Sequence, residues 1–218
     1  MNNNDYIIRR ETASDYHATE NAAREAFWNQ NRPGCDEHYF IHVLRQHEDF
    51  VPELDFVAEV GGKIVGCVMY AKSRLVDESG TEKQVLTMGP LCVVPEYQRM
   101  GIGKALLERT FPIARELGYD TVINFGNPDN YVARGYKSCK KYNVCFEGDV
   151  FPAALLVNEL EEGALDGRKW FYHPSDSDRP CDDPEEFERF DAQFPPKVKG
   201  WQPSQEEFYI HSHSVISG

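Results

Sequence analysis

Residues 98–103 have the composition of an anion-binding turn. The segment reads Gln98-Arg99-Met100-Gly101-Ile102-Gly103, and it lies between an apolar strand-like run (88–94) and a helix-like run (104–117). Two glycines separated by one residue allow the backbone to turn tightly, with no Cβ to block a ligand. The N–H groups at the start of the following helix point the same way, and the helix dipole favours negative charge there. This arrangement predicts a site for a pyrophosphate group.

Two common phosphate-binding motifs do not fit this segment. A Walker A loop needs glycine where Gln98 stands and serine or threonine where Ala105 stands. The dinucleotide-binding fingerprint needs a third glycine where Leu106 stands. The remaining pattern, Gln/Arg-x-x-Gly-x-Gly, resembles the acetyl-CoA pyrophosphate loop of the GNAT superfamily of acyl-CoA-dependent N-acetyltransferases. An ordinary strand-to-helix turn, with glycines there for packing, is the alternative interpretation.

A second segment supports the same resemblance. Tyr131-Val132-Ala133-Arg134-Gly135-Tyr136 is similar to the Tyr-x-x-x-Gly-Phe/Tyr segment that follows the fifth strand of GNAT enzymes. It comes after an apolar run (121–125) and a turn (126–129). The resemblance implies that the Tyr131 hydroxyl lies by the CoA sulfur and acts as a general acid, whereas aromatic packing on the sheet is the alternative. Together the two motifs extend the resemblance from about residue 6 to about residue 160.

The resemblance also implies how the rest of CoA is held. Proline inside the strand at Gly89-Pro90 predicts a bulge, and in GNAT enzymes the fourth and fifth strands splay apart there to admit the pantetheine arm. The backbone N–H near Val93 would polarise the thioester carbonyl, and Asn127 would hold the pantetheine or the Tyr131 loop. A plain edge-strand proline is the alternative. The implied CoA-binding residues are Leu91, Cys92, Val93, Gln98, Arg99, Met100, Gly101, Ile102, Gly103, Lys104, Asn127 and Tyr131, with Tyr131 also catalytic.

The group that removes the proton from the acceptor amine is not evident. Many GNAT enzymes carry a glutamate on the fourth strand, but residues 84–94 contain no carboxylate. Glu25, His38, His42 and Glu96 are chemically suitable, and a chain of water molecules is the remaining route.

Composition excludes several classes of protein. The net charge of −13 argues against a surface for nucleic acid or an anionic membrane. Residues 97–141 nevertheless carry eight basic and four acidic side chains, so this window has a net charge of +4 and the rest of the chain −17. A basic window around the loop suits the phosphates of CoA. The acidic remainder favours a cationic acceptor such as a polyamine, an aminoglycoside or a peptide N-terminus.

Cysteine usage and the chain start indicate a cytoplasmic protein. The six cysteines form neither a Cys-x-x-Cys motif nor a Cys/His cluster with zinc-ligand spacing, so we expect free, inert thiols and no metal. Residues 1–5 lack the basic and apolar regions of a signal peptide. No apolar run approaches the ~20 residues that span a bilayer. We therefore expect no membrane partner.

The order of elements predicts an α/β (α+β) fold of the GNAT type, a mixed, mostly antiparallel twisted sheet of about seven strands flanked by helices. Thr12 and Asp15 form a capping-box pattern before the first helix. Pro112 predicts a kink or restart at Phe111 in the third helix, which Gly118 ends. Strands are expected at residues 6–10, 55–60, 63–76, 84–94, 121–125, 140–145 and 153–160, and helices at 12–28, 36–47 and 104–117.

The composition changes after residue 162, so we divide the chain into an acetyltransferase domain (1–162) and an extension (163–218). The extension is rich in proline and aromatic residues. Asp183-Pro184-Glu185-Glu186 is typical of a helix start, with an N-cap, proline at the first position and an acidic first turn. Phe187, Phe190 and Phe194 follow as one apolar stripe. We expect an ordered extension packed on the core, either walling the acceptor site or only docking there.

The sequence thus predicts transfer of an acetyl group from acetyl-CoA to a primary amine of a small molecule or peptide, by a monomer or homodimer. Two other classes remain open. One is a non-catalytic acyl-CoA-binding module in which Tyr131 only packs. The other is an interaction protein on a GNAT scaffold, whose acidic extension recruits a basic partner.

Overall fold

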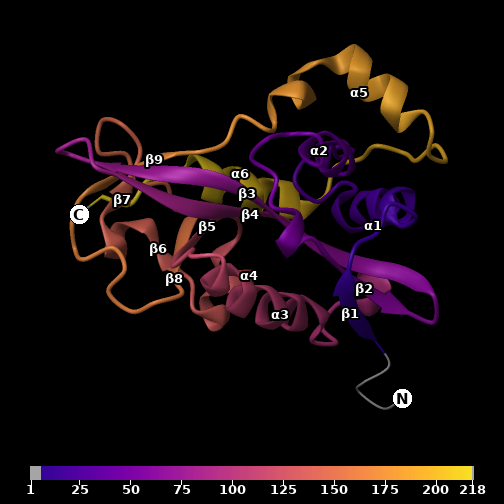
Figure 1. Ribbon diagram of the computed structural model, residues 1–218. Coiled ribbons are helices and arrows are strands. Elements are labelled where there is room, and N and C mark those ends of the chain that lie inside the picture. Colours follow the sequence, from indigo (N-terminus) through magenta and orange to yellow (C-terminus); the bar gives the residue numbers. More distant parts are fainter. Residues whose placement is uncertain (1–5, 218) are drawn as a thin grey trace.

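The computed structural model describes residues 6–217, which form one nine-stranded sheet with helices on both faces (Figure 1). Residues 1–5, in which we found no signal-peptide pattern, and Gly218 lie outside the described part. The strands are β1 (Ile7–Arg10), β2 (Phe56–Val60), β3 (Lys63–Asp77), β4 (Glu82–Val93), β5 (Thr121–Phe125), β6 (Lys137–Ser138), β7 (Val144–Cys145), β8 (Leu155–Glu159) and β9 (Trp170–His173). The helices are α1 (Tyr16–Phe27), α2 (Glu37–Leu44), α3 (Ile102–Glu116), α4 (Pro128–Tyr131), α5 (Pro184–Asp191) and α6 (Pro203–His213). Among these described helices, none combines the length and the apolar character that crossing a membrane requires.

The predicted mixed, mostly antiparallel sheet is confirmed. Its strands follow the order β1-β2-β3-β4-β5-β8-β6, with β9 pairing with both β3 and β7. Among the described strands, β4–β5 and β7–β9 are the parallel pairs. There are nine strands rather than about seven. The two additional strands are β9, which comes from the extension, and the two-residue β6, which precedes the predicted strand at 140–145.

The strand predicted at residues 140–145 is wrong. The Ser138 hydroxyl accepts the N–H of Lys140 (3.2 Å) and caps a 3₁₀ turn that runs to Tyr142. Asn143 then adopts a φ of +54°, and only Val144 and Cys145 return to strand. A serine side chain that satisfies the backbone locally competes with the strand ladder. The apolar pattern alone could not show this competition.

Side chains that alternate along the central strands form two separate cores. Cys67 and Met69 on β3 face α1 and α2, and they belong to one apolar cluster with residues of both helices. Val68 and Tyr70 point to the opposite face, where they pack with α3. Figure 1 shows α1 and α2 on one face of the sheet and α3 and α4 on the other.

Helix α3 continues through Pro112 instead of restarting at Phe111. Leu106, Thr110 and Ala114 are fully buried along one stripe that spans the proline. Packing of this stripe against the sheet stabilises the helix on both sides of Pro112, which outweighs the local cost of the proline. Gly118, with a φ of +91°, follows the helix as its predicted terminator.

Strands β4 and β5 separate soon after they meet. Their parallel pairing covers only Leu86 with Val122 and Thr87 with Ile123. Directly beyond, the β3–β4 register shifts between Val68 and Tyr70, which confirms the bulge predicted at Gly89-Pro90. Residues 91–93 therefore pair with β3 on one side and have no β5 partner on the other.

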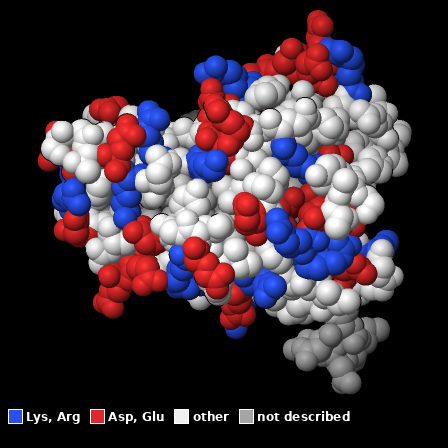
Figure 2. Space-filling model, in the orientation of Figure 1, with Lys and Arg blue, Asp and Glu red and all other residues white. Residues whose placement is uncertain are grey.

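The extension is tied to the core by apolar and ionic contacts. Asp183 caps α5 by accepting two first-turn N–H groups, as predicted. Phe190 and Phe194 are buried against α2. The Arg24 guanidinium, 1% exposed, reaches from α1 to the Asp191 carboxylate (2.7 Å). The opposite side of α5 is charged, and Figure 2 shows its acidic side chains at the top of the view.

A buried carboxyl network lies at the start of β2. Arg45 donates to the Glu11 carboxylate (2.8 Å) and to the Glu20 carboxylate (2.6 Å). Asp55 lies beside Glu11, and its Oδ1 has no hydrogen-bond partner among residues 6–217. Burial, and then the hydrogen bond with Glu11, raises the pKa of Asp55 to about 9. Asp55 therefore keeps a proton at neutral pH.

The proton that Asp55 keeps next to Glu11 predicts that the stability of the fold depends on pH. The unfolded chain releases the proton above about pH 4, whereas the folded state holds it up to about pH 9. The stability that this group contributes is therefore complete in acid and declines as the pH rises through that window. An Asp55→Asn amide has no proton to lose, so the Tm of the variant should fall less than that of the parent between pH 5 and 9. Thermal unfolding across this range measures the difference, and a constant Tm gap would contradict the shared proton.

Candidate active site

The turn before α3 opens on a cavity of about 710 Å³. Gln98 ties this turn to β4, because its Nε2 donates to the carbonyl of Val93 (3.0 Å). Arg99 and Gly101 have φ values of +62° and +86°, so the backbone passes through left-handed conformations before the helix begins. A Cβ built on Gly103 would come no closer than 3.9 Å to the protein. The space in front of the helix N-terminus is therefore open to a ligand.

Two further cavities continue from this one. The middle cavity has a volume of about 410 Å³ and the third about 520 Å³. Leu91 and Tyr131 line all three cavities, and they are the only described residues that do so. A long ligand held at the turn would bring its far end to these two side chains. A second molecule could reach the same point from the third cavity.

Several local features place Tyr131 at this junction. Asn127 caps the short helix α4, since its side-chain oxygen accepts the N–H of Asp129 (3.0 Å). The Tyr131 ring meets the ring of Tyr136 edge-on, with centroids 5.6 Å apart. A Cβ on Gly126 would lie 2.6 Å from the Tyr131 ring, so only glycine allows the ring this position. Burial raises the pKa of the Tyr131 hydroxyl, which therefore stays protonated at neutral pH.

The structure brings most of the predicted CoA-binding residues together. The first cavity is lined by Leu91, Cys92, Val93, Gln98, Arg99, Gly101, Ile102, Gly103 and Tyr131, together with Tyr97, Asp129, Asn130 and Arg134. Asn127 lines the middle cavity. Met100 and Lys104 line none of the three cavities. Met100 is 42% exposed, and Lys104 pairs with Glu108 (3.1 Å) on the outside of α3.

The four side chains considered as bases lie away from the cleft. Glu25 pairs with Lys197 (2.8 Å). His38 is buried beside Asp191, and burial lowers its pKa to about 4. None of Glu25, His38, His42 and Glu96 lines the three cavities. The titratable groups that line the cleft are therefore other residues.

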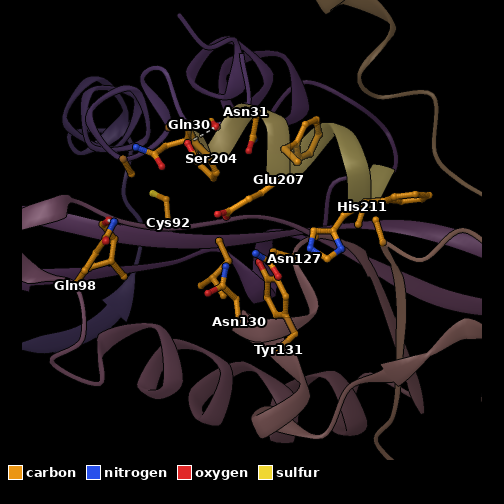
Figure 3. Close-up of a pocket in the computed structure, with 18 residues that line it drawn as sticks. Gln30, Asn31, Cys92, Gln98, Asn127, Asn130, Tyr131, Ser204, Glu207 and His211 are labelled. Carbon is orange, nitrogen blue, oxygen red and sulfur yellow. Dashed lines mark hydrogen bonds between the residues drawn. The ribbon is translucent and has the colours of Figure 1, made fainter. Parts of the chain in front are cut away.

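Helix α6 of the extension supplies the side chains that the sequence did not reveal. Ser204, Glu207, Phe208 and His211 line the middle cavity and follow the spacing i, i+3, i+4, i+7. Figure 3 shows Glu207 and His211 pointing into the cavity from above, opposite Asn127 and Tyr131. Three of the four side chains are polar, so this face of α6 shows no apolar stripe in the sequence. The i, i+3, i+4, i+7 spacing of these side chains is the signal that could have identified the face.

Polar contacts hold α6 in this position. The Ser204 hydroxyl donates to the carbonyl of Gln30 (2.8 Å) at the end of α1. Gln205, which is buried, donates to the carbonyls of Asn29 (3.0 Å) and Gly200 (2.9 Å). The bonds to Gln30 and Asn29 join the extension to the core next to the middle cavity.

One group with the chemistry of metal ligands occurs among the described residues. His47, Asp49 and Asp176 bring one donor atom each within 4.8 Å of one another. None of the three lines a cavity of the cleft. His47 instead pairs with Asp176 (3.2 Å) on the surface. The first cavity of the cleft offers backbone N–H groups and the guanidinium groups of Arg99 and Arg134, which suit an anionic cosubstrate.

Comparison with known proteins identifies the family. Residues 20–138, more than half of the chain, match the sequence model of the acetyltransferase (GNAT) family, and the chain belongs to this family. It is similar to YjhQ of Escherichia coli K12, an uncharacterised N-acetyltransferase, with 30% identity over 99 residues that cover 45% of this chain and 54% of YjhQ. It is also similar to YhbS of the same strain, another uncharacterised N-acetyltransferase, with 28% identity over 58% of this chain and 74% of YhbS. The chain thus spans about half the length of one relative and three quarters of the other.

Solved structures share the fold. The crystal structure of Escherichia coli YhbS in complex with CoA has a TM-score of 0.68 and 24% identity, covering 80% of this chain and 92% of that one. A GNAT family acetyltransferase from Brucella melitensis in complex with acetyl-CoA has a TM-score of 0.58 and 20% identity, covering 79% and 97%. At these identities the likeness concerns the fold, and it confirms the predicted GNAT architecture.

A side chain placed in the open space beside Gly103 should weaken CoA binding. In Gly103→Val the new side chain would enter the first cavity without displacing protein atoms, so we expect unchanged thermal stability. CoA affinity should fall by about tenfold or more, equivalent to ~1.4 kcal/mol. Calorimetric titration with CoA measures this, and Glu108→Gln on the outer side of α3 is the control. Unchanged affinity in a folded Gly103→Val protein would contradict a phosphate site at this turn.

Proposed function

We propose that this chain transfers the acetyl group of acetyl-CoA to a primary amine. The observation that carries this proposal is the meeting of three cavities at Leu91 and Tyr131, one of them opening at the N–H-lined turn before α3. Two structures of the same fold are described with CoA or acetyl-CoA bound, which supports the choice of cosubstrate. A small molecule or peptide as acceptor, cytoplasmic location and a monomeric or homodimeric state stay predictions from the sequence.

The first cavity suits the anionic end of acetyl-CoA. Its pyrophosphate would accept hydrogen bonds from the N–H groups at the start of α3, where the helix dipole favours negative charge. Arg99 and Arg134 line the same cavity and supply two guanidinium groups for phosphate oxygens. The pantetheine arm would then follow residues 91–93, whose edge away from β3 is unpaired. This path ends at Leu91 and Tyr131.

The junction can carry out acyl transfer. The amine nitrogen attacks the thioester carbonyl carbon, and a backbone N–H near Val93 stabilises the negative charge that develops on the carbonyl oxygen. A C–N bond forms and the C–S bond breaks. Tyr131 donates its proton to the departing CoA thiolate. Its raised pKa ensures that this proton is present at neutral pH.

We assign removal of the amine proton to His211. It is half-buried and points into the middle cavity opposite Tyr131, whereas Glu207 on the same stripe is exposed (Figure 3). Imidazole is the side chain that most often acts as a general base near neutral pH. A base on α6 and an acid on α4 would then face each other across the thioester. The two proton transfers would use separate groups.

If Tyr131 is the general acid, removing its hydroxyl should slow catalysis and leave CoA binding nearly unchanged. Tyr131→Phe keeps the ring and removes the proton donor, so kcat should fall by ~10²-fold or more. CoA affinity should remain within a few-fold of the parent. Tyr136→Phe is the matched control, because Tyr136 is buried outside the three cavities and its hydroxyl donates to the Met88 sulfur (3.6 Å). Thiol release assays with a panel of amines measure kcat. A Tyr131→Phe enzyme with the parental rate would assign Tyr131 to packing.

The proposed base predicts a rate defect. His211→Gln removes the imidazole and keeps a polar side chain, so kcat/KM should fall by ~10²-fold. His213→Gln is the control, since His213 stacks on Tyr209 (4.1 Å) and lines none of the three cavities. Thiol release assays measure kcat/KM for both variants. Equal kcat/KM values for the two variants would exclude His211 as the base.

A further inference from the structure

The third cavity has walls of a different chemistry from the first. Phe27, Phe40 and Tyr172 give it an aromatic lining next to Leu91. Four carboxyl groups also line it, and none of them lines the other two cavities: Asp36, Glu37, Asp178 and Asp182. The cavity is therefore apolar near the junction with Tyr131 and acidic where α2 meets the extension.

The negative charge of this cavity is only partly compensated. Asp36 pairs with Arg32, and Glu37 accepts hydrogen bonds from the side chain of Asn31 (2.9 Å) and the N–H of Asp36 (3.2 Å). Asp178 and Asp182 make no ion pair or side-chain hydrogen bond within residues 6–217. No Lys, Arg or His is among the described residues that line the cavity. Burial raises the pKa of Glu37, so a cation nearby would stabilise its ionised form.

A buried amide at the inner end of the cavity lacks a partner. Asn124 is 1% exposed and lines this cavity beside Tyr131. Its Oδ1 has no hydrogen-bond partner among the described residues. Buried polar atoms are nearly always hydrogen-bonded in proteins, and an amide oxygen accepts an N–H. A ligand N–H next to Tyr131 would satisfy this atom.

We propose that the acceptor is a small flexible diamine or oligoamine that binds in the third cavity. The reacting amine donates an N–H to the Asn124 oxygen beside Tyr131. The methylene chain packs against Phe27 and Phe40, and a second ammonium group lies at Asp178 and Asp182. This assignment rests on the acetyl transfer proposed above. The two substrates would then bind in surroundings of opposite charge. Guanidinium groups line the CoA end of the cleft, and four carboxyl groups line the acceptor end.

The test compares two acceptors with the same number of carbons, one with and one without a distal ammonium group. Hexamethylenediamine carries a second ammonium group, and hexylamine ends in a methyl group. Initial rates of CoA release are measured for the full-length parent, for the Asp178→Asn/Asp182→Asn double variant and for Glu162→Gln, an exposed control residue outside all three cavities.

The parent and the control should prefer the diamine by about tenfold or more in kcat/KM, which corresponds to ~1.4 kcal/mol. The double variant should lose this preference through a higher KM for the diamine. Equal use of the two amines by the parent, or a preference that survives in the double variant, would overturn the proposal.

Calorimetry separates this proposal from the proposed function. If the parent releases no CoA with these two amines or with the amine panel, acetyl transfer fails as the function, and calorimetric binding of hexamethylenediamine in the presence of CoA then tests the acceptor cavity alone. Binding by the parent that the double variant lacks would support the diamine site. Absence of binding to the parent would refute it.

Discussion

The separation of β4 from β5 is the constraint on which the whole cleft depends. After Thr87 pairs with Ile123, the bulge at Gly89-Pro90 turns β4 away, and residues 91–93 lose the neighbour that a continuous sheet would provide. A backbone edge inside a folded protein needs polar partners. A ligand with its own amide groups can supply them, and the pantetheine arm of CoA has such groups. Under the proposed function, the site is a gap in the sheet that the cosubstrate would complete.

Elements from both faces of the sheet close around this gap. The turn before α3 and the helix α4 lie on one face, while α1 and α6 approach from the other (Figure 3). Gly126 allows the Tyr131 ring to approach the end of β5. The bonds from Ser204 and Gln205 fix α6 to the end of α1. The proposed acid and the proposed base are therefore carried by elements that are distant in the sequence and held by independent contacts.

The sequence could predict the features whose causes are local. Gly101 in a left-handed turn, the bulge at Gly89-Pro90 and the Asp183 cap each follow from the conformational limits of one or two residues. The pairing of β9 with β3 and the position of α6 depend on contacts between segments far apart in the chain, for which no local pattern exists. Asn124 was missed because an apolar strand pattern does not show that one of its polar residues opens on a cavity.

The position of the acetyl-CoA sulfur tests the central claim most directly. A crystal structure of the full chain with acetyl-CoA, or with a non-hydrolysable analogue, would show it. We expect the sulfur within about 3.5 Å of the Tyr131 hydroxyl, with the pyrophosphate at residues 98–103 and the pantetheine along residues 91–93. A cosubstrate whose sulfur lies away from Leu91 and Tyr131, or whose phosphates lie outside the turn before α3, would contradict this account.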